Sequence, residues 1–319
     1  MIDRPKFIVS HAPFWHDGSR ISTRNYHIML ATLPALLAGI FYYGVAAVGV
    51  VALSVSSAIF WELLINRLSR KPETIGDGHA ALIGLLFAML LPANFPWWAL
   101  LVGTFFAVVI GKAVYGGLGC NPFNPVVVAI AALGLSWKEL LDFNVALQHF
   151  DLNFAMLYPL TALKYFGTQA VEHYSALDLL LGRQSGGIGA TFGLGLILGG
   201  AYLLLRGFIR WEISLSFIAG VMVTALLFNL ADGSRFAGPA FHVLTGYTLI
   251  GAFFLATDDS SSPVNLIPML IYGAGAGILT VLIRNIGAYV DGVIFAILVM
   301  NLVNPLLDKI RPQAIGKVA

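Results

Sequence analysis

Long apolar stretches separated by short polar segments dominate the chain. A helix that crosses the hydrocarbon core of a bilayer needs about 20 predominantly apolar residues. Ten stretches approach that length, and each predicts a membrane helix. They lie at 26–43, 45–65, 79–92, 97–115, 125–137, 190–206, 213–231, 239–257, 264–283 and 291–307. The third and fifth are short for a full crossing, so we expect broken, tilted or re-entrant helices in an all-α integral membrane protein.

Composition supports the same class of protein. The chain is 58% hydrophobic and 11% charged, whereas soluble domains carry roughly 25% charged residues. A net charge of +2 gives no reason to expect a nucleic-acid partner. The single cysteine, Cys120, excludes an internal disulfide and a multi-cysteine metal or iron–sulfur centre. No P-loop, dinucleotide fingerprint or zinc motif is present, so we predict no metal site and neither an ATPase nor a metalloprotease.

Basic residues orient the predicted spans. Cytoplasmic loops of membrane proteins carry an excess of Lys and Arg. With a cytoplasmic N-terminus, the inside segments hold most of the Lys and Arg side chains, whereas the short outside loops hold only Arg235 and Arg284. The inside set is Arg4, Lys6, Arg20, Arg24, Arg67, Arg70, Lys71, Lys112, Arg206, Arg210, Lys309, Arg311 and Lys317. Both termini are therefore predicted to be cytoplasmic, and a long segment at 138–189 is predicted to lie outside.

The two halves of the sequence resemble each other. HAALIGLLFAMLLP (79–92) is echoed by HVLTGYTLIGAFFLAT (242–257), and NPVVVAIAAL (124–133) by DGVIFAILVM (291–300). Five predicted spans separate equivalent positions, and because five is odd the halves face opposite ways. This pattern predicts two inverted five-helix repeats, as in many transporters.

The repeat sets the predicted organisation of the chain. A cytoplasmic N-terminal arm (1–25) precedes the first transmembrane repeat (26–137). A periplasmic segment (138–189), the second transmembrane repeat (190–307) and a cytoplasmic tail (308–319) follow.

Two polar segments interrupt the apolar pattern near the cytoplasmic side. GKAVYGGLGCNPFNP (111–125) is rich in glycine and proline, so we expect non-helical backbone that is buried in protein or lines a cavity. The amides of Asn121 and Asn124 could contact a planar polar ligand or simply cap helix ends. ATDDSSSP (256–263) could bind a cation or be a solvated loop.

Three charged residues lie near the ends of predicted spans. Glu62 and Arg284 are placed where a long side chain reaches the interface at low cost, so both are expected to snorkel. Asp291 opens the last span, where a carboxylate favours the helix N-terminus.

One threonine follows a run of glycines at the start of the sixth span, in SGGIGATFGLGLILGG (185–200). Glycines such as Gly187 and Gly189 permit close approach to the backbone. A helix N-terminus also offers free N–H groups to a phosphate. Thr191 could therefore bind or be esterified to a phosphate, or it could be only a helix start behind a glycine-rich turn.

Three segments bear a family resemblance. IGKAVYGGLGCNPFNP (110–125), GAFFLATDDSSSP (251–263) and GAYVDGVIFAILVMNLVNPLLD (287–308) resemble the family of the Rnf complex D subunit. More distantly they resemble the B subunit of the sodium-translocating NADH:quinone reductase. The resemblance implies FMN joined through its phosphate to Thr191 in GGIGAT, with Ile188 where many such sites carry Ser or Thr. It also implies a non-covalent riboflavin nearer the cytoplasm, for which Asn121 and Asn124 are the candidate contacts.

The resemblance implies a function as well. The chain would relay electrons through the membrane of a bacterial inner-membrane ferredoxin:NAD oxidoreductase, coupled to Na⁺ or H⁺ translocation, without holding a complete active site itself. Implied partners are membrane lipid, the A, B, C, E and G subunits, especially the periplasmic flavoprotein G, and a flavin transferase that modifies Thr191 on the periplasmic side. The sequence alone leaves two alternatives open, a channel or secondary transporter without a redox cofactor, and a structural anchor for other subunits.

Overall fold

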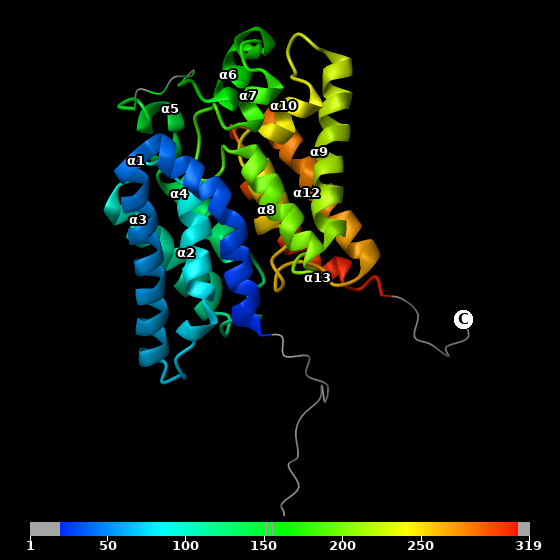
Figure 1. Cartoon of the computed structure of the whole chain (residues 1–319). Helices are drawn as coiled ribbons and strands as arrows, with labels where there is room; N and C mark the ends of the chain where they lie inside the picture. The colour runs from blue at the N-terminus through cyan, green and yellow to red at the C-terminus, as the bar shows by residue number, and fades with distance from the viewer. Residues whose placement is uncertain (1–19, 151, 153, 155, 312–319) are drawn as a thin grey trace, which may run out of the picture.

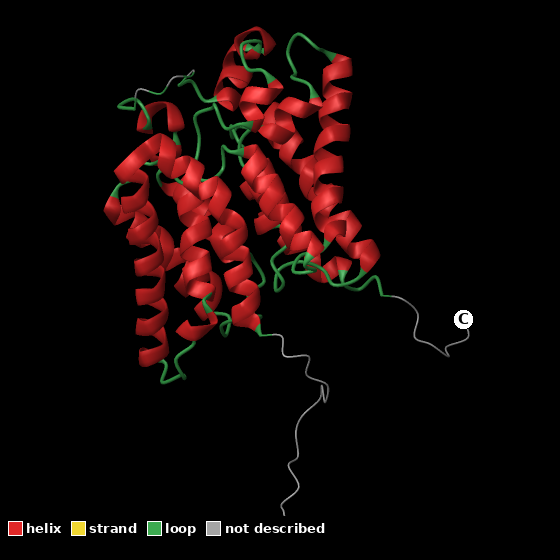
Figure 2. Ribbon diagram, in the orientation of Figure 1, coloured by secondary structure: helices red, strands yellow, loops and turns green. Residues whose placement is uncertain are grey.

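The computed structural model describes residues 20–150, 152, 154 and 156–311, and every regular element in these ranges is helical (Figure 2). Three helices are long and apolar enough to cross a membrane, namely α1 (Ile21–Leu68), α9 (Trp211–Ala231) and α12 (Leu266–Asn285). The predicted all-α membrane fold is confirmed. The number of crossings and the inverted repeat stay predictions, and most of the N-terminal arm and of the C-terminal tail lies outside the described residues.

The first half consists of α1 and three shorter apolar elements. Gly44 breaks α1 with a φ of +62°, in the left-handed region that glycine tolerates. Figure 1 shows α1 folding back there, which gives the two arms predicted as separate spans. The elements that follow are α2 (His79–Leu90), α3 (Trp97–Phe105) continued by the π-helical segment η2 (Phe106–Ala113), and α4 (Pro125–Ser136).

The second half also contains a broken span. After α8 (Gly193–Leu205) and α9, the chain forms α10 (Pro239–Leu244), α11 (Thr248–Ile250) and the π-helical segment η5 (Gly251–Leu255). The break falls at Gly246, whose φ is +65°. A Cβ at Gly246 would lie 2.3 Å from an Asp291 carboxylate oxygen, so this break also depends on glycine. The helices α12 and α13 (Val293–Leu307) complete the half.

The segment between the halves forms short helices at one end of the molecule. These are η3 (Lys138–Leu141), α5 (Phe143–Ala146), α6 (Pro159–Phe166), η4 (Thr168–Val171) and α7 (Ala176–Leu180). In Figure 1, α5, α6 and α7 lie at the top, whereas α1 begins and α13 ends at the bottom. The start of α1 and the end of α13 thus lie on the opposite side from this outer segment, and the cytoplasmic placement of the termini stays a prediction.

The two halves pack through helices that the repeat relates. α1 packs against α8, and α4 packs against α13. In the predicted repeat these are spans one and six, and spans five and ten. Glycines permit the first contact, since a Cβ on Gly199 of α8 would lie 2.0 Å from the carbonyl oxygen of Ala31. This pairing of equivalent helices is consistent with the inverted repeat, which stays a prediction.

Candidate functional site

Thr191 lies in a tightly held loop just before α8. Two backbone hydrogen bonds join this loop to the end of α2, from Ile188 N to Leu91 O (3.0 Å) and from Gly189 N to Met89 O (2.9 Å). Thr191 is only 5% exposed. The helix begins at Gly193, so Thr191 precedes the first turn rather than standing in it.

The glycines beside Thr191 are explained by packing against α2. A Cβ on Gly187 would lie 2.7 Å from Met89 O, and one on Gly189 would lie 2.5 Å from the Met89 side chain. Both positions therefore require glycine even without a ligand. Ile188, between them, is fully buried. Gly187 also lines the space beside Thr191, whereas the group closest to Gly189 is Met89.

Three polar atoms around Thr191 are buried without hydrogen-bond partners among the described residues. They are Tyr158 OH, Gln184 Oε1 and Ser185 Oγ. The Gln184 amide nitrogen is satisfied, since it donates to the carbonyl oxygens of Leu179 (3.2 Å), Thr191 (3.2 Å) and Leu244 (2.9 Å). Buried polar groups are normally paired. These three residues and Thr191 line one small space, which is too closely packed to admit a water molecule.

An aromatic cavity of about 270 Å³ adjoins that space. Tyr158 and Tyr247 line both, so they form the wall between them. The remaining aromatic lining comes from the outer segment and from the start of α13: Phe143, Tyr165, Tyr289 and Phe295. Its volume is close to the lower end of the roughly 300–1,000 Å³ that small-molecule pockets occupy. The outer site thus combines a buried hydroxyl cluster with a cavity lined by aromatic side chains and by the charged residues Lys138, Glu139, Asp142 and Asp291.

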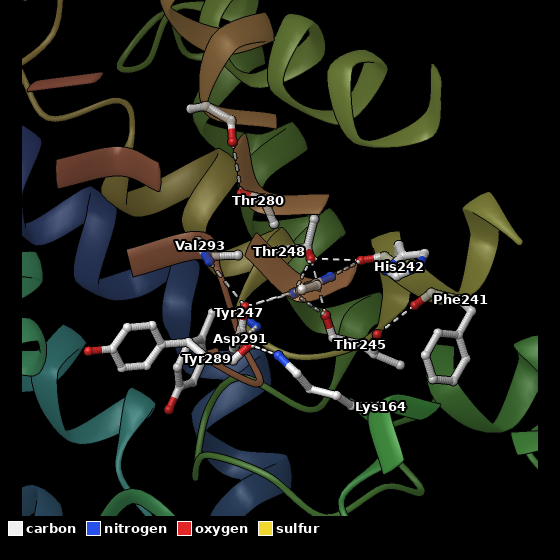
Figure 3. A network of polar contacts seen from close by, with 12 residues as sticks. Lys164, Phe241, His242, Thr245, Tyr247, Thr248, Thr280, Tyr289, Asp291 and Val293 are labelled. Carbon is white, nitrogen blue, oxygen red and sulfur yellow. Dashed lines mark hydrogen bonds and ion pairs between the residues drawn. The ribbon is translucent and has the colours of Figure 1, made fainter. Parts of the chain in front are cut away.

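A buried ion pair fixes the break beside this site (Figure 3). Arg284 Nη2 lies 2.9 Å from Asp291 Oδ1, and Arg284 also donates to the carbonyl oxygens of His242 (2.7 Å) and Thr245 (3.2 Å). Asp291 accepts from Tyr247 N (2.8 Å) and from Val293 N (3.1 Å). The expectation that Arg284 snorkels is wrong, because the side chain is 3% exposed and satisfies the carbonyls that the broken helix leaves free. The predicted role of Asp291 at the start of α13 is confirmed.

Lys164 ties the outer segment to the same region. Its ammonium donates to the carbonyl oxygens of Gly287 (2.6 Å) and Tyr289 (2.5 Å), as Figure 3 shows in part. Partial burial and the nearby Lys138 lower the pKa of Lys164. Because Tyr289 lines the aromatic cavity, Lys164 holds the outer segment against the loop that forms one of its walls.

At the opposite end, Asn124 has structural partners for its whole amide group. Its Oδ1 accepts from Val126 N (2.9 Å) and Val127 N (3.2 Å), which caps α4. Its Nδ2 donates to Leu255 O (3.0 Å) at the end of η5. Asn124 and Asp291 occupy equivalent positions of the predicted repeat, and both cap a helix while binding the broken span at 239–255.

Asn121 is less completely bonded. Its Nδ2 donates to Phe123 O (3.0 Å) and to Asp258 Oδ2 (3.3 Å), while its Oδ1 is buried and unpartnered among the described residues. Asp258 also accepts from Ser260 and Ser261 (2.9 Å each), and Asp259 pairs with Arg24. The ATDDSSSP segment thus joins the two halves. A cavity of about 40 Å³ lies beside Asn124 and Asp258.

The inner end also contains a second buried ion pair, which was not predicted from the sequence. Lys112 Nζ lies 2.8 Å from Glu62 Oε1, and both residues are 4% exposed. The expectation that Glu62 snorkels is wrong, because α1 continues past it to Leu68 and η2 packs against that arm. The signal that could have revealed the pair is Lys112, a lone cation placed between apolar residues and the glycine-rich turn.

Comparisons with known proteins identify relatives of the chain along nearly its whole length. Residues 8–316 match the model of the NQR2, RnfD, RnfE family. The D subunit of a proton-translocating ferredoxin:NAD(+) oxidoreductase complex of Clostridium ljungdahlii is 36% identical over 95% of this chain and 94% of the relative. The D subunit of a Na(+)-translocating complex of Acetobacterium woodii is 36% identical over 96% and 94%. The D subunit of an ion-translocating oxidoreductase complex of Aeromonas salmonicida is 33% identical over 97% and 99%.

Proposed function

The chain belongs to the NQR2, RnfD, RnfE family, and on this premise we propose that it is the flavin-carrying membrane subunit of an ion-translocating ferredoxin:NAD oxidoreductase complex. Its similarity to three D subunits covers nearly the whole length of each protein compared. The observation that carries the flavin assignment is the set of unpartnered buried polar atoms around Thr191, next to an aromatic cavity.

The polar groups around Thr191 have the hydrogen-bonding chemistry that a phosphate and its attached chain require, although the space between them is closed. The hydroxyls of Ser185 and Tyr158 can each donate to a phosphate oxygen, and Gln184 Oε1 can accept from a ribityl hydroxyl. Burial and the negative charge of Asp291 raise the pKa of Tyr158 well above its ordinary value, so this hydroxyl keeps its proton. An ester at Thr191 Oγ1 would place the phosphate among these groups.

The adjoining cavity fits the aromatic part of the same cofactor. Tyr247 and Tyr158 separate it from Thr191, and its aromatic side chains suit a flat ring, beside the charged lining residues Lys138, Glu139, Asp142 and Asp291. A flavin held there would supply one- and two-electron transfer, while the protein sets its position and electrostatic surroundings. Thr191 is buried in this arrangement of the side chains. A flavin can therefore occupy the site only if Tyr158 and the loop at 184–187 move outward.

For the second flavin, riboflavin, we propose a place at the inner end of the molecule with Asn121 as the contact, next to the cavity that Asn124 and Asp258 line. Asn121 keeps a free acceptor oxygen, whereas the Asn124 amide is already bonded on both sides. The cavity is about 40 Å³, far below the volume of a flavin ring. Riboflavin therefore fits only if the lining elements separate, and we assign no electron-transfer step to it.

We propose the remaining partners from the same family membership. Electrons would pass between the periplasmic flavoprotein, the G subunit, at the outer site and the A, B, C and E subunits, in a bacterial inner membrane. The outer segment at 138–189 supplies Tyr158 and Gln184 beside Thr191, and so it offers the surface for the G subunit. A flavin transferase acting on that side would modify Thr191.

Flavin fluorescence in a denaturing gel tests the proposal. The full chain is produced with an active flavin transferase, denatured in SDS and compared with Thr191→Ala. We expect a fluorescent band for the wild type and none for the variant, because only a covalent flavin survives denaturation. Thr191→Ser keeps a hydroxyl and is expected to retain fluorescence.

Thr168→Ala is the matched control, since Thr168 lies in the same outer segment and donates only to Ser234 O (2.6 Å). It is expected to stay fluorescent. A dark wild-type band, with the transferase shown to modify another substrate, would remove the covalent flavin and favour the transporter alternative. Riboflavin, being non-covalent, should appear in the supernatant after denaturation.

A further inference from the structure

We infer that the junction of α1, α8 and α9 at the inner end of the molecule binds the phosphate group of an anionic phospholipid. The inference goes beyond the proposed function and does not depend on it. The binding groups are gathered around Phe208, and we call Phe208, His27, Arg206 and Arg210 together the Phe208 site. Figure 1 shows the start of α1, the end of α8 and the start of α9 at the same end of the molecule.

A tight turn between α8 and α9 holds Phe208 in place. α8 ends at Leu205, and Gly207 follows with a φ of +71°, in the left-handed region that favours glycine. Phe208 N donates to Leu203 O (2.9 Å), and Phe208 O accepts from Arg24 Nε (3.1 Å). The turn is therefore bonded both to the end of α8 and to the start of α1, which fixes the position of its side chains.

The ring of Phe208 positions a histidine and an arginine. His27 stacks on it with the ring centroids 4.8 Å apart, and the Arg206 guanidinium lies over it with Cζ 5.9 Å from the centroid. His27 Nδ1 lies 2.6 Å from Tyr202 OH, which fixes the imidazole from its other side. A guanidinium that lies on an aromatic face keeps its N–H edge free, and this planar edge matches the oxygens of a phosphate. Phe208 thus presents Arg206 to an anion.

The junction carries an excess of positive charge. Arg24 is paired with Asp259, so these two charges cancel. Arg206 and Arg210 are exposed, and neither takes part in an ion pair with any residue that the structure describes. The charged residues around the junction are Arg20, Arg24, Arg206, Arg210, Glu212, Asp258 and Asp259. The arginines outnumber the carboxylates by one, and the single negative charge of a phosphate diester balances this excess.

The start of α9 supplies further donors for the same anion. The first N–H groups of a helix have no intrahelical acceptor, and they favour phosphate. Arg210 occupies the N-cap position of α9 and makes no capping hydrogen bond with its side chain. Glu212 is the acid of this first turn, and its Oε2 is buried rather than directed to the surface. A phosphate between the start of α9 and Arg206 would receive hydrogen bonds from both.

The surroundings of the site favour a lipid over a free anion. Leu205 is 89% exposed and Trp211 is 54% exposed, directly beside the two unpaired arginines in the sequence. Exposed apolar side chains at the end of a membrane helix contact acyl chains, and tryptophan is enriched at the level of the headgroups. Basic groups between membrane helices bind anionic headgroups. The arginines therefore suit the phosphate, and the apolar residues suit the acyl chains attached to it.

Thermal unfolding of the full chain in an uncharged detergent tests the inference. Dioleoylphosphatidylglycerol is titrated into one sample and dioleoylphosphatidylcholine, with the same acyl chains, into another. We expect the Tm to rise and saturate with the anionic lipid only, because a ligand that binds only the folded state stabilises it. Arg206→Gln should weaken the apparent affinity by about tenfold or more, because it removes a charge-assisted hydrogen bond.

Arg235→Gln is the matched control for Arg206→Gln. Arg235 also lies over a phenylalanine ring, with Cζ 5.3 Å from the centroid of Phe236. It belongs to the opposite end of the molecule, because the neighbouring Ser234 O accepts from Thr168 of the outer segment. This variant should respond to the anionic lipid as the wild type does.

Fluorescence quenching keeps the test decisive if Arg206→Gln fails to fold. Acyl-brominated phosphatidylglycerol should quench the tryptophan fluorescence of the wild type more than brominated phosphatidylcholine does, and Trp211→Phe should lose this difference. The inference is overturned if both lipids raise the Tm equally, if Arg206→Gln responds as the wild type does, or if Trp211→Phe keeps the excess quenching. It is also overturned if soluble glycerol phosphate at the same concentration stabilises the chain as well as the lipid does.

Discussion

Burial decides what the individual polar residues of this chain can do. Glu62, Arg284 and Thr191 all lie near ends of predicted spans, and all three are almost inaccessible in the folded chain. Their positions along the chain could be predicted from the sequence, but their surroundings could not. The partners of Arg284 come from a helix break at Gly246, and the Lys112 partner of Glu62 comes from η2, both distant in sequence. Asp291 is the contrasting case. Its capping partner, Val293 N, lies only two residues further along the chain, so this role could be predicted from the sequence.

At this scale Tyr158→Phe separates a ligand contact from a packing role. Removal of an unpartnered buried hydroxyl should leave the free energy of unfolding unchanged or raise it, by about 1 kcal/mol at most. If the hydroxyl holds the flavin phosphate, the variant should nevertheless carry less flavin per chain or show a shifted flavin redox potential. Because the pKa of Tyr158 is raised well above its ordinary value, we expect the effect to be constant across neutral and mildly alkaline pH.

Tyr174→Phe provides the comparison for Tyr158. Its hydroxyl lies in the same outer segment and donates to Leu157 O (2.7 Å), so its loss should lower stability slightly without altering flavin content. Equal flavin content and equal potential in Tyr158→Phe and the wild type would exclude Tyr158 from the site.

At the scale of elements, the apolar pattern located the membrane helices and predicted that some are broken, but it did not give the position of the break in the second half. The apolar helices fall on the predicted spans, and the short spans predicted at 79–92 and 125–137 are short helices of 12 residues each, whereas the short helices of the outer segment lie outside every predicted span. The break at 245–247 and the two π-helical segments were not predicted. Each depends on contacts from other elements, such as Asp291 on Tyr247 N and Asn124 on Leu255 O. The apolar periodicity of one segment contains no information about these contacts with other segments.

Gly39 on α1 tests how the elements position the Thr191 loop. A Cβ there would lie 1.8 Å from Ile188 O, so Gly39→Ala must displace the loop or the helix. We expect a loss of about 1–3 kcal/mol in the free energy of unfolding, seen as a lower Tm, together with weaker flavin fluorescence in the denaturing gel.

Gly49→Ala on the same helix is the matched control. Nothing lies within 4 Å of a Cβ at Gly49, and alanine is the better helix former, so stability should be unchanged or slightly higher. A Gly39→Ala chain as stable and as fluorescent as Gly49→Ala would show that the contact with Ile188 is not needed.

At the scale of the whole molecule, the two halves place chemistry at opposite ends. The outer end carries Thr191, the aromatic cavity and the Arg284–Asp291 pair, while the inner end carries Asn121, Asp258 and the Glu62–Lys112 pair. Charge distribution predicted the two sides from sequence. The sequence could not predict that the broken span at 239–255 reaches both ends, bonded to Asp291 at one and to Asn124 at the other.

The single cysteine makes this arrangement testable. Cys120 is exposed and lies in the turn before α4, at the same end of the molecule as the start of α1. A membrane-impermeant maleimide should label it in inside-out vesicles and leave it unlabelled in right-side-out vesicles. In a Cys120→Ser chain, a cysteine introduced as Thr168→Cys should show the reverse pattern. Labelling of both positions from the same side would contradict the predicted topology.

The burial of Thr191 bears on how the protein is made. A transferase cannot reach a hydroxyl that is 5% exposed and enclosed by Tyr158, Gln184 and Ser185. Attachment of a flavin at this position therefore has to precede the final closure of the loop on α2, or reopen it. With the proposed flavin at Thr191, maturation and folding would be one ordered process, in which an unmodified chain could close prematurely and escape the transferase. The ratio of modified to unmodified chains would then depend on the rate of flavin attachment relative to the rate of loop closure.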